Sequence, residues 1–519
     1  MTNNNIKSKP NLYIVLTGGT VGGTKDNPDE ATRYNPTDRG SFLLVESLTK
    51  AYPNLKNEYN VKVITLNPLI NSQDISMAYI SKNIYETLFN LTSDIKEGDC
   101  FAISHGTDNT EASITALDMS EGLRQLKQKI AIGLWGAMHT PDSDTPDGPS
   151  NFANLIRYFS SQDKKAGIFA SFSEQIQPAI CVRKKHAREV DTFKLPHYYF
   201  DKIKQKLSSI QFDKSDFIHL HMPNHDEFAQ IEIIHPYMHK SEIDALKSGI
   251  TQGKIHGLIL ENTGDISTGK ISYSNDVQEL LKFASNQNIC ITQTHTEYAY
   301  YVKYPNISTN NIKNNDSIKI TNSYGLSTEK VHIIMAMGLA KINKDIIKSA
   351  DDLDKIYQQR TDGIVIPDIY IPKNRIDFSK SDIPAADIDL SQSIHSKNST
   401  NKFNIKVIRN HISMYPEMLN AILDDINQNK IHGVVLEGPG NGTYNCQLQC
   451  IIDKLQEKNI PLIVSSMCRG YINTVAEEHG IGSSGIVTED CIKLLNHALI
   501  KNLDKKKMHE LFEKYRFME

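Results

Sequence analysis

The fold follows from the stretch LYIVLTGGT, residues 12–20, together with a second stretch, FAISHGTD, residues 101–108. Each stretch begins with apolar, strand-favouring residues and ends in a turn that contains glycine and threonine. In an open α/β sheet, the loops at the carboxyl ends of the strands converge where ligands bind. We therefore predict that Thr20 and Thr107 face one pocket.

Residues 1–200 alternate between candidate strands and candidate helices, which predicts a doubly wound, mostly parallel α/β sheet. The expected strands cover residues 12–16, 61–66, 100–104, 130–135 and 166–171. The expected helices include residues 40–51, 78–91, 110–127 and 151–159. A polar segment at residues 22–40 interrupts the first strand–helix connection. A connection of this length is more often functional, for example a lid that covers a binding site, than purely structural. A plain surface loop would have the same composition.

The rest of the chain contains an internal repeat, because KIHGLILE at residues 254–261 recurs as KIHGVVLE at residues 430–437. In both places a glycine-bearing loop, an expected helix and an expected strand follow in the same order. The offset, 430 − 254 = 176 residues, is too long for a solenoid and indicates two copies of a smaller α/β domain. The expected organisation is an N-terminal domain at 1–200, a linker at 201–213, one copy at 214–350, a second linker at 361–402 and a second copy at 403–519.

Composition restricts the class of protein. The chain has 519 residues, of which 39% are hydrophobic and 23% are charged, as in soluble globular proteins. A net charge of −4 with both signs mixed argues against a nucleic-acid partner or an anionic membrane. No apolar run approaches the roughly 18 residues that cross a bilayer, and residues 1–10 lack the apolar core of a secretory signal.

Cysteine and histidine usage bears on compartment and metal binding. The seven cysteines include no CxxC pair, which is typical of a reducing compartment, so we expect a cytoplasmic protein. Histidine and cysteine are not spaced as metal ligands. We therefore expect neither a metal nor another cofactor.

Four polar residues are candidates for chemistry. The glycine pair before Thr20 allows a sharp turn that presents a hydroxyl beside backbone N–H groups, although a plain turn would look the same. Thr107 and Asp108 precede an expected helix start, which suits either helix capping or the binding of a substrate carboxylate. Lys184, in the run RKKH, is either a solvated cation or the base that activates a threonine hydroxyl.

These stretches resemble the L-asparaginase/glutaminase family, whose two signature loops read TGGT and HGTD. The resemblance covers most of residues 11–200 and includes GAM at residues 136–138 and DGPSN at residues 147–151. It implies hydrolysis of a side-chain amide through an acyl-threonine intermediate, with L-asparagine as substrate and L-glutamine as an alternative. Arg183 departs from the family pattern, in which threonine is common at this position, and so does His139 after GAM.

The resemblance also implies a role for each matching residue. The implied catalytic residues are Thr20 as nucleophile, Tyr34 on the lid, Thr107, Asp108 and Lys184. The implied substrate-binding residues are Ser72, Gln73 and Asp108. Which of the two threonines attacks stays open. In the second copy of the smaller domain, Asn441 and Thr443 lie in a glycine-rich loop that would help to complete a site in a neighbouring subunit, so we expect a homo-oligomer.

Other functions remain open at this point. One is a glutaminase or an ammonia-releasing subunit of an amidotransferase, which would share the same core. Another is a non-catalytic amino-acid sensor or scaffold built on the same fold. We favour an enzyme, because a protein that only binds an amino acid has no need of a nucleophile and a base.

Overall fold

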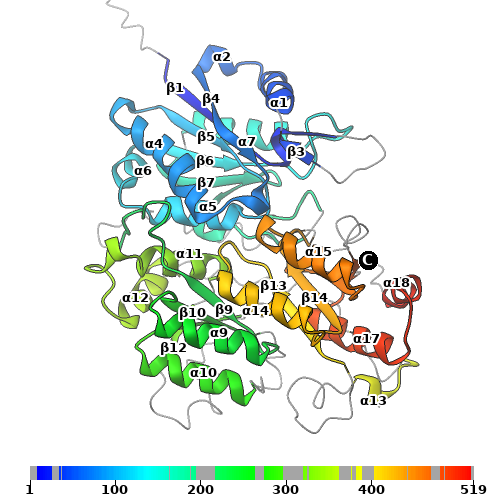
Figure 1. The fold of residues 1–519 in the computed structure, drawn as a ribbon. Helices are drawn as coiled ribbons and strands as arrows, with labels where there is room; N and C mark the ends of the chain where they lie inside the picture. Colours follow the sequence, from blue (N-terminus) through cyan, green and yellow to red (C-terminus); the bar gives the residue numbers. More distant parts are fainter. Residues whose placement is uncertain are drawn as a thin grey trace, which may run out of the picture. The chain divides into compact units, whose positions relative to one another are not determined.

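The computed structural model describes most of the chain, which forms two compact units (Figure 1). The first unit comprises Met1–Lys184 and Glu189–Asp226, and the second comprises Lys185–Arg188 and Glu227–Glu519. The described residues are 9–25, 34–36, 38–162, 164–186, 189–194, 217–262, 274–295, 320–323, 326–361, 376, 381–388, 403–440, 442–468, 480–483 and 485–515.

The first unit is built on a six-stranded sheet with the strand order β4-β1-β5-β6-β7-β8. Its strands are β1 (Asn11–Gly18), β4 (Asn60–Ile70), β5 (Cys100–Ser104), β6 (Ala131–Trp135), β7 (Gly167–Phe172) and β8 (Gln175–Pro178). All neighbouring pairs are parallel except β7 and β8. The expected mostly parallel sheet is thus confirmed, with an antiparallel strand added at one edge.

Helices connect these strands. They are α1 (Asp38–Ala51), α2 (Leu55–Glu58), α3 (Met77–Tyr79), α4 (Glu86–Leu91), α5 (Thr110–Met119), α6 (Arg124–Lys129) and α7 (Gly148–Ser160), with a π-helical segment, Ile80–Tyr85, between α3 and α4. The single helix expected over residues 110–127 was wrong. It is interrupted at Ser120, because Glu121 N donates to Leu220 O at 2.8 Å and Leu220 N donates to Met119 O at 2.9 Å.

One face of this sheet has a continuous apolar core. Because strand residues alternate between faces, Leu12, Ile14 and Leu16 of β1 point the same way and pack with Leu44 of α1 and Phe152 of α7. The chain's single tryptophan, in β6, is fully buried in the same cluster. This packing holds β1, β5 and β6 side by side, so the loops that follow them leave from one edge.

The segment expected to form a lid is described only at its two ends. There, β2 (Gly23–Lys25) pairs antiparallel with β3 (Tyr34–Pro36). Residues 26–33 and the linker expected at 201–213 lie outside the described residues. Within the expected linker at 361–402, the described part includes the short helix α13 (Ala385–Ile388).

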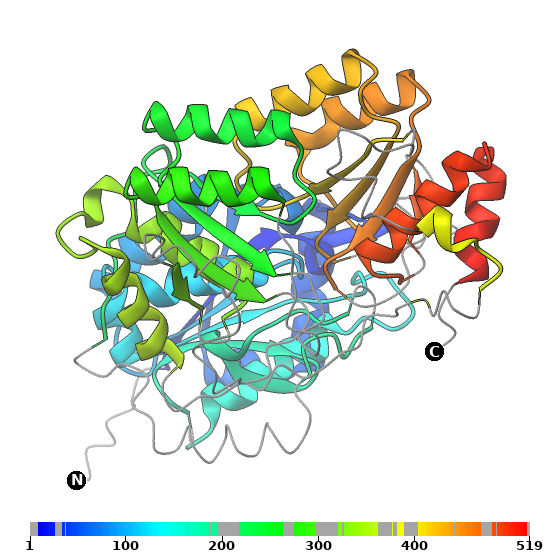
Figure 2. The same cartoon turned by 90° about the horizontal axis from the view of Figure 1, so that it is seen from below.

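The second unit contains two four-stranded parallel sheets (Figures 1 and 2). The first sheet has β9 (Ile231–Ile234), β10 (Gly257–Asn262), β11 (Cys290–His295) and β12 (Ile320–Asn322), and the second has β13 (Ile405–Arg409), β14 (Gly433–Gly438), β15 (Leu462–Ser466) and β16 (Ile481–Gly482). In both, the strands lie side by side in sequence order.

Figure 2 shows helices on both faces of these two sheets. One layer contains α9 (Lys240–Thr251), α10 (Asn275–Asn286), α14 (Pro416–Asn427) and α15 (Gln449–Glu457). Besides the short α13, the other α-helices that the structure describes in this unit are α11 (Thr328–Gly338), α12 (Ala350–Thr361), α17 (Thr488–Ile500) and α18 (Lys505–Lys514). Across the described residues of both units, no helix is both long enough and apolar enough to span a bilayer.

Candidate active site

The site is built where β1 and β5 end beside each other. Thr17 joins the two strand ends, because its hydroxyl donates to Ser104 O at 2.7 Å and its amide donates to Ser104 Oγ at 3.1 Å. The loops that follow then pass in contact at two glycines. A Cβ atom on Gly19 would lie 2.5 Å from the Cα of Gly106, and Gly19 has a φ of +72° that favours glycine. The two signature loops are therefore held together at their bases.

Lys184 joins this site from a segment that follows β8. Its ammonium group donates to Thr107 Oγ1 at 2.7 Å and to Asp108 Oδ1 at 2.7 Å. Its backbone amide donates to Glu111 Oε1 at 2.9 Å, which fixes the segment against the first turn of α5. The lysine is only 8% exposed, so the interpretation as a solvated cation is wrong. Because charge-assisted hydrogen bonds in a buried site are strong, this contact positions both signature-loop residues.

The turn after β4 supplies a further group. Ser72 begins a 3₁₀ turn, Ser72–Asp74, and its hydroxyl oxygen accepts a hydrogen bond from Asp108 N at 3.1 Å. A Cβ atom on Gly106 would approach that hydroxyl to 2.5 Å, so the loop packs directly against the turn. Asn109, which sequence reasoning did not single out, donates to Ile75 O at 3.2 Å. Its position just before α5 is the only sequence signal that could have indicated it.

His105 is a second residue that sequence reasoning left without a role. Its ring nitrogens lie 2.6 Å from Gly106 O and 2.8 Å from Ser113 Oγ. Complete burial lowers the pKa of the ring to about 4, so the ring is neutral near pH 7. A neutral ring that donates from Nδ1 to Gly106 O and accepts at Nε2 from Ser113 satisfies both contacts. His105 therefore connects the signature loop to α5 through hydrogen bonds.

The turn after β6 is held by Asp147. Its carboxylate accepts hydrogen bonds from Met138 N at 3.0 Å and His139 N at 2.9 Å. Asn151, one helical turn further on, donates to Gly136 O at 3.0 Å. Burial raises the pKa of Asp147, while the backbone donors act in the opposite direction. The GAM and DGPSN segments thus form one hydrogen-bonded corner at the same strand ends.

The remaining candidate residues differ in how far the structure describes them. Thr20 follows Gly19 directly and begins a short 3₁₀ turn, Thr20–Gly22. Tyr34 begins β3 and pairs with Lys25, but its side chain lies outside the described residues. Gln73 lies within the turn that Ser72 begins.

The two candidates from the glycine-rich loop belong to the second unit. Asn441 lies outside the described residues. The hydroxyl of Thr443 donates to Pro439 O at 3.0 Å, within its own loop. This contact closes the loop on itself and gives no direct evidence of a role in binding.

The site can therefore present an ammonium group, a hydroxyl and a carboxylate to one small molecule. The described residues contain no group of His, Cys, Asp and Glu side chains arranged to hold a metal ion. The available groups suit acid–base and nucleophilic chemistry on a polar substrate.

Comparison with known families matches both units. Residues 11–212 match the family described as "Asparaginase, N-terminal", and residues 410–512 match the "Glutaminase/Asparaginase C-terminal domain". The first match contains the strand ends and loops of the candidate site. The second match contains β14, β15 and β16 of the second four-stranded sheet and begins directly after β13.

Individual relatives are distant. The chain is 26% identical over 246 residues to L-asparaginase 2 of Bacillus subtilis, a match that covers 44% of this chain and 60% of that protein. It is 32% identical over 196 residues to L-asparaginase 2 of Escherichia coli, covering 36% of this chain and 50% of that one. The chain thus spans less than two thirds of the length of either relative.

A solved structure shares the fold. A probable cytoplasmic L-asparaginase from Campylobacter jejuni superposes with a TM-score of 0.50 at 18% identity. The superposition covers 67% of this chain and 99% of that chain.

Proposed function

Because this chain belongs to the L-asparaginase/glutaminase family, we propose that it hydrolyses the side-chain amide of L-asparagine to L-aspartate and ammonia. The observation that carries the proposal is the buried contact of Lys184 with Thr107 and Asp108. A non-catalytic sensor would bind an amino acid through charges and donors. It would have no use for a threonine hydroxyl held against an ammonium group.

In the proposed reaction Thr20 is the nucleophile. Its hydroxyl oxygen bonds to the side-chain amide carbon, and its proton passes to the departing nitrogen, so that ammonia leaves and an ester remains. Water then attacks the ester carbon, Thr20 recovers its proton, and aspartate is released. Thr107, hydrogen-bonded to Lys184, is the proposed partner for the proton transfers, with Tyr34 assisting at Thr20.

Substrate binding is assigned to the groups around the start of α5. We propose that Asp108 binds the α-amino group, since one of its carboxylate oxygens pairs with Lys184 while the side chain is about one tenth exposed. Ser72 and Gln73 would bind the α-carboxylate. Glutamine is the alternative substrate, because one extra methylene is discriminated by only about 1–3 kcal/mol in a pocket.

We also propose that the second unit arose by duplication of one C-terminal domain, in copies near residues 214–350 and 403–519 with a linker at 361–402. Corresponding hydrogen bonds support this. His256 N donates to Gln230 O at 2.9 Å and accepts at its ring from Gln230 N at 3.2 Å. His432 makes the same pair of bonds to Asn404, at 2.8 Å and 3.0 Å.

We also propose that the protein is a cytoplasmic homo-oligomer in which the loop of Asn441 and Thr443 contributes to substrate binding. Light scattering of the purified chain would test the oligomeric state. Substituting Thr443 with alanine would test the loop through the KM for asparagine.

The activity is tested by measuring ammonia from the purified full chain with L-asparagine, and separately with L-glutamine. Turnover of asparagine that disappears in Thr20→Ala supports the proposal, with Thr65→Ala, an exposed threonine of β4, as the matched control. Binding of asparagine without release of ammonia, measured by calorimetry, would instead support a sensor. Release from glutamine alone would support a glutaminase.

A further inference from the structure

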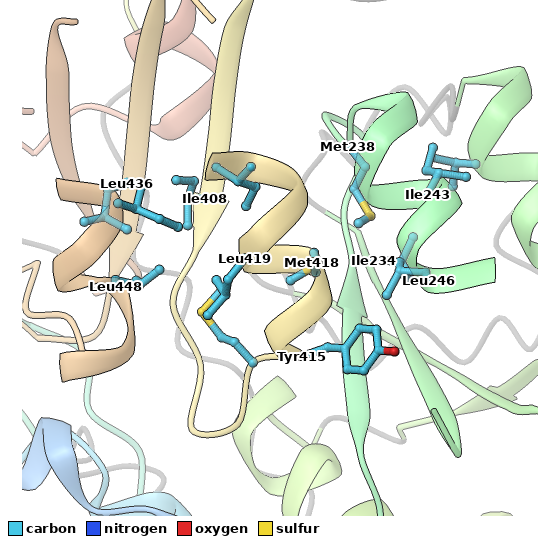
Figure 3. Close-up of a cluster of buried hydrophobic side chains, with 14 of the residues drawn as sticks. Ile234, Met238, Ile243, Leu246, Ile408, Tyr415, Met418, Leu419, Leu436 and Leu448 are labelled. Carbon is cyan, nitrogen blue, oxygen red and sulfur yellow. The ribbon is translucent and has the colours of Figure 1, made fainter. Parts of the chain in front are cut away.

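The two sheets of the second unit meet along β9 and α9 on one side and β13 and α14 on the other, a contact here called the junction. Its outer layer is apolar. Ile234 and Leu246 from the first side share one buried cluster with Met418 and Leu419 from the second (Figure 3). Tyr415 packs across the junction, because a Cβ atom on Gly249 would lie 2.9 Å from its ring. This layer resembles a protein–protein interface contained within one chain.

The junction also contains a buried set of ionisable side chains that the proposed catalysis does not use. The first side contributes acidic residues, Glu232, Glu242 and Glu261, and the second contributes basic residues, Lys406, Arg409 and His411. Burial raises the pKa of Glu232 to about 8 and lowers that of His411 to about 3, so this pair is neutral near pH 7. Lys406 pairs with Glu242, Arg409 Nε lies 2.6 Å from Glu261, and His411 Nε2 lies 3.4 Å from Glu232. All six side chains are at most 7% exposed. Acidic groups thus lie on one side and basic groups on the other.

Equivalent positions in the two copies carry different charges. The matching bonds of Gln230 to His256 and of Asn404 to His432 align β9 with β13 at an offset of 404 − 230 = 174 residues. Glu232 therefore corresponds to Lys406, and His235 corresponds to Arg409. The helices align at the offset of the repeat, 430 − 254 = 176 residues, so Glu242 corresponds to Met418.

We propose that this charge pattern makes the junction heterotypic, so that the first copy pairs with the second copy of the same chain and never with its own kind from another chain. The proposal rests on the proposed duplication and is independent of the reaction. Pairing two first copies would put Glu242 opposite Glu232, an acid, so Glu242 would lose the cation that Lys406 supplies. Pairing two second copies would put Lys406 opposite Met418, with no carboxylate. A buried charge without a partner is strongly destabilising, so both pairings are excluded.

Arg409 adds a second asymmetric element. Its guanidinium group binds both Glu261 and Glu437, which are equivalent residues of the two copies. Each carboxylate also accepts a hydrogen bond from a threonine at 2.9 Å, Thr328 for Glu261 and Thr488 for Glu437. The corresponding residue of the first copy, His235, is kept neutral by burial, which lowers its pKa well below its ordinary value. One cation therefore serves both copies, and only the second copy supplies it.

Exchanging the charges of Glu242 and Lys406 in the full chain tests whether this ion pair stabilises the junction. Glu242→Lys and Lys406→Glu should each lower the melting temperature of the second unit, and the double variant should recover most of the loss. The matched control is the reciprocal swap of Lys254 and Glu417, which also spans the junction but is about half exposed, and it should change little. No recovery in the double variant would overturn the assignment of this pair.

Crosslinking at wild-type charge tests the choice of partner, even if the charge variants fail to fold. Ser241 contacts Asp425 across the junction, so Ser241→Cys/Asp425→Cys should crosslink within one chain when treated with a short bismaleimide. Peptide mapping separates this product from links to native cysteines. A link between the introduced thiols of two Ser241→Cys chains would overturn the proposal. So would a link between separate Ser241→Cys and Asp425→Cys chains after mixing. Neither readout depends on asparagine hydrolysis, so failure here leaves the ammonia assay unaffected.

Discussion

The ammonium nitrogen of Lys184 lies 2.7 Å from the hydroxyl oxygen of Thr107, although 77 residues separate them in the chain. The ammonium group donates to that oxygen, so the hydroxyl hydrogen of Thr107 is directed elsewhere. In the proposed reaction it is directed at the substrate or at the attacking water. Asp108 accepts a second hydrogen bond from the same ammonium group, also at 2.7 Å.

Replacing Lys184 with methionine should therefore remove a proton-transfer partner while keeping a side chain of similar length. We expect kcat to fall by about 10²–10⁴-fold, the range for loss of a general acid or base. The ammonia assay measures this change. Lys50→Met, at an exposed position of α1, is the control and should keep full activity. Wild-type turnover in Lys184→Met would contradict the assigned role.

Adding a methyl group at Gly106 should disturb the site without removing any functional group. The new Cβ would lie 2.5 Å from Ser72 Oγ and 3.2 Å from Gly19 Cα, so both neighbouring loops must shift. Small displacements of positioning groups cost about 10²-fold in rate. We expect Gly106→Ala to raise the KM for asparagine and to lower kcat.

The control for that variant is Gly253→Ala, where a Cβ meets no atom within 4 Å. The positive φ of this glycine should cost roughly 1 kcal/mol of stability and leave the kinetics unchanged. Equal kinetic effects of the two substitutions would show that the contact between the loops is unimportant.

His105 should make the first unit sensitive to acid. Its pKa is lowered to about 4 in the folded protein, below the ordinary value of 6.5. Between these two values the unfolded chain binds a proton that the folded chain does not, so this part of the stability is present above pH 6.5 and is lost as the pH falls toward 4. At 1.36 kcal/mol per pKa unit, the loss is about 3 kcal/mol.

Hydrogen exchange at the C2 position of histidine, followed by mass spectrometry, measures this pKa directly. The His105 peptide should show a midpoint near pH 4 in the native chain and an ordinary midpoint in urea. A native midpoint near 6.5 would mean that the ring is not desolvated as described.

Glu232 should make the stability of the second unit fall as the pH rises, the opposite of the trend expected from His105. Burial raises its pKa to about 8, so the folded chain keeps a proton that the unfolded chain loses above about pH 4.5. Stability is therefore lost as the pH rises from about 4.5 to 8. Glu232→Gln removes this dependence while keeping the shape of the side chain. We expect the variant to gain roughly 3–5 kcal/mol over the wild type as the pH rises to 8.

Denaturant unfolding of wild type and Glu232→Gln at pH 5, 6, 7 and 8 tests this difference. Glu46→Gln, at a half-exposed carboxylate of α1, serves as the control and should show no trend. A difference between Glu232→Gln and wild type that stays constant with pH would show that Glu232 is ionised in the folded chain.

Some features of the fold could be predicted from residues close together in the chain. The strand at residues 100–104 matches β5 because an apolar run followed by a turn has few alternatives. The helix expected at 110–127 failed because a distant residue, Leu220, pairs with the backbone at Ser120. Such pairing leaves no local signal. The contact of His105 with Ser113 was missed for the same reason, because it depends on how α5 packs.

The sequence by itself determined the alternation of strands and helices, the two glycine-threonine loops and the repeated KIHG segment. These are local patterns, written in the spacing of apolar and turn-forming residues. Only the tertiary structure decided which charges meet, as in the pairing of Lys184 with Asp108 and of Lys406 with Glu242. Ion pairs depend on distance through space and on exclusion of water, and packing sets both only after the sheets have formed.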